Sequence, residues 1–122
     1  MPNMNTYDEA LKVLKGKKKT APQRRRLHNN TYLEQEDGAI YVRCYDTDVI
    51  CFQPNMPVVI KHGGYLTNFT ADTITSFGPT GLRVEKRHRR PCPLTVEWKG
   101  QTYDWTNLTR SLTLTDTGIK TD

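Results

Sequence analysis

The residues of this chain best suited to binding chemistry are basic, and they are clustered. Residues 12–26 contain eight Lys or Arg side chains and no Asp or Glu. Such a run is typical of segments that contact the phosphate backbone of nucleic acids, with an affinity that falls as salt rises. It also fits an acidic protein surface, or a solvated segment that keeps a small protein soluble. The candidate contact residues within it are Lys17, Lys18, Lys19, Arg24, Arg25 and Arg26.

A second basic cluster lies at residues 83–90, where five side chains are basic and one is acidic. Arginine binds phosphate well because its planar guanidinium can donate two parallel hydrogen bonds. We therefore add Arg87, Arg89 and Arg90 to the candidate contact residues. A strand with charged, solvated side chains is the alternative interpretation of the same cluster.

Aromatic side chains could add stacking to these charges. Tyr41, Arg43 and Tyr45 alternate along one predicted strand and share a face, whereas the opposite face is more apolar. Aromatic residues at alternating strand positions usually pack in a core. Because these two tyrosines flank an arginine, we interpret all three residues as candidates for contact with bases or a protein partner.

No catalytic signature stands out in the sequence. It lacks GxSxG, P-loop, HExxH and Cys-His patterns. His62 precedes two glycines and could pair a general base with a backbone anion site, although a structural histidine beside a turn is the simpler interpretation. We therefore expect no enzymatic activity and name no catalytic residue. A metal-independent nuclease built from His, Arg and Thr is the remaining enzymatic alternative.

The cysteines and the hydropathy limit the protein class further. Cys44, Cys51 and Cys92 are too widely spaced for a metal site or a disulfide framework, which predicts reduced thiols, no metal and no cofactor. No run approaches the ~18 apolar residues of a membrane span, and no signal peptide is visible. We expect no membrane partner and a cytoplasmic location.

A short N-terminal helix is predicted over residues 6–15. Thr6 can cap it, and Glu9 can accept a hydrogen bond from the Thr6 amide. Gly16 is a typical C-terminal stop. Its apolar face must dock on the body of the protein or on a second copy, because a helix this short is unstable alone in water. The residues of that face that could form a homo-oligomer are Tyr7, Leu11 and Leu14.

The rest of the chain alternates with the period of β-strands. After the helical segment at 1–16 we predict an extended basic linker at 17–29, a β-rich domain at 30–115 and a flexible tail at 116–122. Strands are predicted at 32–36, 40–45, 49–53, 58–62, 65–69, 82–87, 94–98, 101–105 and 111–115, with a short helix at 70–77. The expected fold class is mainly β (α+β): a small antiparallel β-meander or barrel-like domain with an N-terminal amphipathic helix, a basic linker and one short internal helix.

Several segments of the central region resemble a group of small, functionally uncharacterised bacteriophage proteins. The matching segments are NNTYLE at 29–34, DGAIYVR at 37–43, TDVI at 47–50 and GGYLT at 63–67. The likeness covers about residues 7–70 and implies a phage source and an infected bacterial cytoplasm, or a virion. The group usually has His where this chain has Tyr45, Trp where it has Tyr65, and Thr-Thr-Lys then Arg-Ile-Asn at 69–74. These differences remove the residues best suited to catalysis.

The sequence thus predicts a small phage accessory protein that acts by binding nucleic acid or a nucleoprotein through a basic arm, the predicted linker at 17–29. The main alternative is an interaction module that inhibits or redirects a host enzyme or defence complex, with the arm in an acidic protein groove. A minor virion component is a third possibility.

Overall fold

The chain folds into two helices and ten strands in the part that the structure describes. A computed structural model describes residues 3–86 and 94–121. The helices are α1 (Tyr7–Lys15) and α2 (Asn68–Phe77). The strands are β1 (Arg24–His28), β2 (Thr31–Glu36), β3 (Ala39–Cys44), β4 (Thr47–Phe52), β5 (Val58–Lys61), β6 (Arg83–Lys86), β7 (Leu94–Trp98), β8 (Gln101–Trp105), β9 (Ser111–Thr115) and β10 (Gly118–Thr121). The predicted mainly β class is confirmed.

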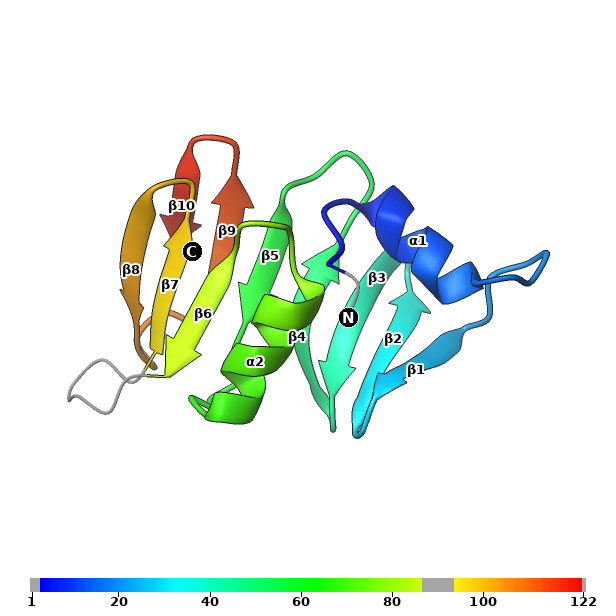
Figure 1. Cartoon of the computed structure of the whole chain (residues 1–122), viewed down its shortest axis with the longest axis horizontal. Coiled ribbons are helices and arrows are strands. Elements are labelled where there is room, and N and C mark those ends of the chain that lie inside the picture. Colours follow the sequence, from blue (N-terminus) through cyan, green and yellow to red (C-terminus); the bar gives the residue numbers. More distant parts are fainter. Residues whose placement is uncertain (1–2, 87–93, 122) are drawn as a thin grey trace.

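Two antiparallel sheets build the molecule (Figure 1). The larger has the order β1-β2-β3-β4-β5-β9-β10, so β2 to β5 form four strands of the predicted meander and β1 extends it by a strand that was not predicted. The smaller has the order β6-β7-β8. It joins the β10 end of the larger sheet, where the Gln101 side chain accepts a hydrogen bond from the Ile119 amide at 2.8 Å. The indole of Trp98 donates to the Thr115 carbonyl at 2.8 Å and adds a second link.

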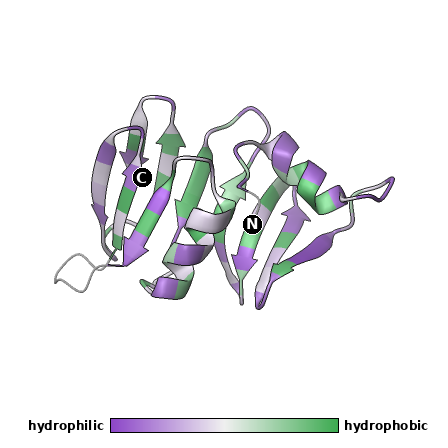
Figure 2. Cartoon of the chain, in the orientation of Figure 1, coloured by the Kyte–Doolittle hydropathy of each residue, from purple (hydrophilic) through white to green (hydrophobic). Residues whose placement is uncertain are grey.

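The core lies between the inner face of the larger sheet, the two helices and the smaller sheet. Apolar residues alternate along the strands, as the hydropathy colours of Figure 2 show. Ile40 and Val42 point inward and are fully buried, whereas Tyr41 between them is half-buried on the outer face. Helix α1 packs against β2 and β3, and α2 lies between β3, β4 and β6. The outer face of the sheet therefore stays open to solvent.

Helix α1 begins and ends where the sequence predicts. The Thr6 hydroxyl accepts the Glu9 amide at 3.2 Å, and Gly16 ends the helix with a positive φ of 59°. The Glu9 carboxylate reaches back to the amide of Asn5 rather than to that of Thr6. Leu14 is fully buried on the sheet of its own chain, so the apolar face docks within the molecule.

Two predicted irregular segments contain strands. The basic linker expected at 17–29 includes β1, which pairs with β2 and places Arg24 opposite Glu34. The flexible tail expected at 116–122 includes β10, which pairs with β9. The loop at 16–23 is therefore attached at both ends, and β9 lies between β5 and β10 in the sheet.

One predicted strand is wrong. Residues 65–69 form a loop and the first turn of α2, because Thr67 caps that helix and it begins two residues before the predicted start at residue 70. The Thr67 hydroxyl accepts the Thr70 amide at 3.2 Å, so the helix begins earlier than expected. It ends before Gly78, as predicted.

Candidate nucleic-acid interface

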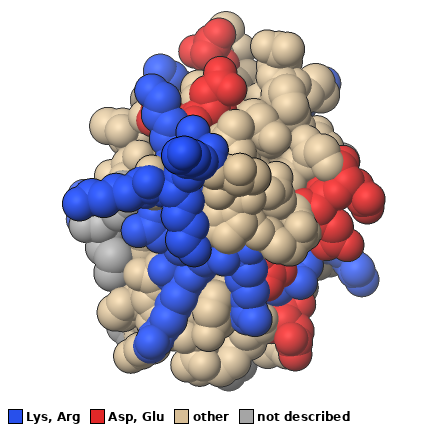
Figure 3. All heavy atoms as spheres, turned by 90° about the vertical axis from the view of Figure 1, so that its right-hand side faces the viewer, with Lys and Arg blue, Asp and Glu red and all other residues tan. Residues whose placement is uncertain are grey.

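One end of the molecule carries a continuous positive surface, called the basic end below. It combines the last turn of α1, the loop at 16–23 and strand β1, and Figure 3 shows its Lys and Arg side chains gathered on one face. All of its basic side chains are exposed. Its residues are Lys12, Lys15, Lys17, Lys18, Lys19, Arg24, Arg25 and Arg26. Lys12 and Lys15 lie in the last turn of α1 and thus join the predicted contact set.

The lysines of the basic end have free ammonium groups. Within residues 3–86 and 94–121, none of these five lysines forms an ion pair or a side-chain hydrogen bond. An exposed ammonium that is not committed to a carboxylate can replace counterions on a phosphate backbone. The loop lysines, Lys17, Lys18 and Lys19, are therefore the strongest part of the predicted contact set.

The three arginines are more constrained than an extended linker would leave them. Arg25 donates from its guanidinium to the Val13 carbonyl near the end of α1. Arg24 pairs with Glu34 at 2.8 Å, and its guanidinium lies 3.6 Å from the centre of the Tyr32 ring. Arg26 donates to the Asn29 side chain. These contacts fix the side chains on the surface while leaving them exposed.

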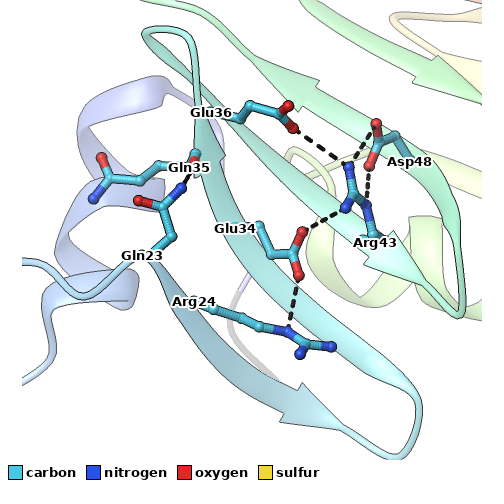
Figure 4. A network of polar contacts seen from close by, with 7 residues as sticks. All are labelled: Gln23, Arg24, Glu34, Gln35, Glu36, Arg43 and Asp48. Atoms are coloured by element: carbon cyan, nitrogen blue, oxygen red, sulfur yellow. Dashed lines mark hydrogen bonds and ion pairs between the residues drawn. The ribbon is translucent and has the colours of Figure 1, made fainter.

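Arg43 is surrounded by carboxylates of its own chain. Its guanidinium lies 2.7 Å from Asp48 and 2.8 Å from Glu34, with Glu36 at 3.6 Å (Figure 4). The hydrogen bond to Asp48 raises the pKa of Arg43 above its usual value, against the opposing effect of burial. Three carboxylates around one guanidinium leave no net positive charge for phosphate, so Arg43 is better explained as a cross-strand link between β2, β3 and β4.

The two candidate tyrosines are in different environments. Tyr41 lies on the outer sheet face opposite Cys51 of β4, and burial raises the pKa of its hydroxyl. Tyr45 follows the end of β3 in the turn to β4, where 63% of it is exposed. It contacts Phe69 edge-on, with ring centres 5.7 Å apart. Tyr45 therefore does not extend the Tyr41–Arg43 face, and the prediction that all three share one face is wrong for it.

Arg87, Arg89 and Arg90 lie outside the described residues, so their part in the interface stays a prediction.

His62 is built into the fold as a structural residue. Its Nε2 lies 3.1 Å from the Thr106 carbonyl and 2.9 Å from the Thr109 carbonyl, so that nitrogen carries the proton. Its Nδ1 accepts the Gly64 amide at 2.9 Å. Both ring nitrogens are thus occupied, although the ring borders a pocket of about 680 Å³ that includes Lys61 and Arg110. This supports the structural interpretation of His62.

The other chemistry-bearing groups that the structure describes form no centre. Cys44 and Cys51 are buried free thiols, and burial raises the pKa of each. Across residues 3–86 and 94–121, no three His, Cys, Asp or Glu side chains gather closely enough to hold a metal ion. Neither of the two described helices has the length and apolar character needed to span a bilayer.

Comparison with known proteins adds no relative. No protein-family model matches the chain, and no curated protein or solved structure matches it significantly. The class of protein is therefore defined by the fold and the surface alone: a small antiparallel β protein with one strongly basic end. The resemblance to phage proteins stays a prediction.

Proposed function

We propose that this protein binds nucleic acid, alone or within a nucleoprotein, through its basic end and without catalysing a reaction. The observation that carries the proposal is the group of free lysines on one exposed surface. These lysines lie within residues 12–26, a segment that contains no acidic side chain. The cellular setting, an infected bacterial cytoplasm or a virion, is part of the same proposal.

The distribution of charge supports a local site over general basicity. The whole chain has a net charge of +5, whereas residues 12–26 alone contribute +8. Residues 28–82 hold two basic and six acidic side chains. A phosphate backbone would be attracted to the basic end and repelled by carboxylates elsewhere, which orients the complex.

Fluorescence anisotropy with labelled nucleic acid at a series of salt concentrations tests this function. The variant K17Q/K18Q/K19Q removes three free charges from the loop. The control K61Q/K99Q/K120Q removes three exposed charges from other elements, so both variants have the same net charge. If the three loop lysines contact phosphates, the slope of log K against log salt falls by about 2–3 for the loop variant, whereas the control keeps the wild-type slope.

Two results would overturn the proposal. One is a wild-type protein that binds no nucleic acid even at low salt. The other is an equal loss of affinity in the two variants, which would mean that net charge and not the basic end governs binding. A host protein recovered with the wild type after nuclease treatment, and lost with the loop variant, would point instead to an acidic protein partner.

A further inference from the structure

An exposed aromatic pair lies beside the basic end. Tyr45 is in the two-residue loop between β3 and β4, and Phe69 is in the first turn of α2. Their rings meet edge to face at 5.7 Å, and both residues are exposed, Tyr45 by 63% and Phe69 by 36%. Large aromatic side chains normally bury their rings. This pair instead presents ring surface to solvent.

The backbone at Tyr45 is strained for such a residue. Tyr45 has a φ of 54°, in the left-handed region that Gly, Asn and Asp adopt most readily. Residues with positive φ in two-residue hairpin loops are usually of those three types. A bulky aromatic residue there costs conformational energy and gains little burial, so its exposed ring is better explained by a binding role than by stability.

The turn at Asn29 and Asn30 connects this pair to the basic end. Arg26, on β1, donates to the Asn29 side chain. Asn30 donates from its side chain to the Tyr45 hydroxyl at 3.2 Å, and its carbonyl accepts the Tyr45 amide at 2.8 Å. Figure 1 shows that the β1–β2 turn, the β3–β4 turn and the first turn of α2 lie at the same edge of the molecule. Positive charge and aromatic surface are thus neighbours along one edge.

We propose that the ligand of the basic end is single-stranded nucleic acid. A base stacks on Tyr45 and Phe69, the neighbouring phosphate contacts Arg26, and the strand continues along β1 so that phosphates further along it contact the loop lysines. This inference rests on the proposed function and specifies its ligand. Proteins that bind single strands combine a positive surface for the backbone with aromatic rings for the bases. A duplex keeps its base faces stacked inside the helix, so it can use the charges but not the rings.

The decisive variant is Tyr45→Asn, because it removes the ring and suits the positive φ. The probes are oligothymidylate and oligouridylate of about 20 nucleotides, longer than the ~4–16-nucleotide sites of small single-strand binders, and a DNA duplex of equal length. We expect Tyr45→Asn to bind both single strands about tenfold more weakly and the duplex unchanged, with an undiminished melting temperature. Tyr45→Phe, which keeps the ring, should retain wild-type affinity.

Met56→Ala is the matched control for a lost exposed side chain. Met56 is 60% exposed and follows the opposite end of β4, away from the turn that holds Tyr45. It should leave binding to every probe unchanged. Affinity for oligothymidylate over oligouridylate, or the reverse, would identify DNA or RNA as the source of the strand.

The inference is overturned if Tyr45→Asn binds single strands as the wild type does, if it loses affinity for single strand and duplex equally, or if the wild type prefers the duplex. In those cases salt-dependent binding through the lysines could still stand. A wild type that binds none of the probes at low salt would overturn the proposed function itself.

Discussion

The guanidinium of Arg25 on β1 donates a hydrogen bond to the carbonyl of Val13 in the last turn of α1. The final carbonyls of a helix lack partners within the helix. Here the Gly16 amide donates to the Lys12 carbonyl and the Lys18 amide donates to the Lys15 carbonyl. The Arg25 guanidinium donates to the Val13 carbonyl. The contact holds β1 against the helix end and closes the lysine loop between them.

Gly16 makes room for this contact, which a double-mutant cycle can test. A Cβ on Gly16 would lie 2.6 Å from Arg25 Nη1, and Gly16 itself has a φ of +59°. We expect Gly16→Ala to lower the free energy of unfolding by about 1 kcal/mol or more. The cost should be smaller in an Arg25→Ala background, because only the backbone term remains. Urea denaturation of the four proteins measures the coupling, and strictly additive effects would contradict the packing described here.

Arg43 should matter for stability and not for binding. Its side chain is 28% exposed and joins Glu34 to Asp48. Arg43→Ala leaves the half-buried Asp48 carboxylate without its cation, whereas Glu34 keeps its pair with Arg24. We expect the free energy of unfolding to fall by about 1–2 kcal/mol. Arg83→Ala is the control, because its pair with Glu85 is exposed and worth about 0.5 kcal/mol or less.

Nucleic-acid affinity of the same Arg43→Ala protein, measured by anisotropy, should equal that of the wild type. A folded Arg43→Ala protein with clearly weakened binding would restore Arg43 to the contact set that the sequence suggests.

The buried thiols predict a loss of stability in alkaline solution. Burial raises the pKa of Cys44 and of Cys51 above the 9.0 of a free thiol. The unfolded chain therefore loses these thiol protons at a lower pH than the folded chain does. The stability that the protonated thiols contribute is fully present below about pH 9 and is lost as pH rises through their pKa in the folded state. Urea unfolding under reducing conditions at about pH 7 and about pH 10 measures the effect. Between these two pH values the free energy of unfolding should fall less for C44A/C51A than for the wild type. Equal losses would mean that other groups, such as Tyr41, govern the effect.

Local signals explain why some elements were predictable. Helix α1 has its cap at Thr6, its stop at Gly16 and an apolar stripe between them, all within the segment itself. Strand β3 alternates Ile40 and Val42 with Tyr41 and Arg43, so its hydropathy pattern alone identifies the inner face. In both cases the deciding interactions are close in sequence.

Other elements depend on partners far along the chain. Strand β1 has the composition of a basic run, and it becomes a strand because β2 supplies hydrogen bonds and Glu34 supplies a counter-charge. Residues 65–69 have strand-like composition, yet the Thr67 cap begins a helix there. The basic end was largely predictable from charge, whereas the Tyr45–Phe69 pair was not, because contact across the fold brings its members together.

Strand β1 is the outermost strand of the larger sheet, so one side of its backbone faces no other strand within the described residues. An open edge of this kind invites strands of other molecules to add to the sheet, and closely spaced charges discourage it. Arg24, Arg25 and Arg26 put three charges on this edge, which disfavours the addition of further strands, as well as contributing to the basic end. If all three arginines were neutralised, a loss of binding could not be separated from a loss of solubility. The loop lysines can be changed while the charges on the β1 edge stay in place.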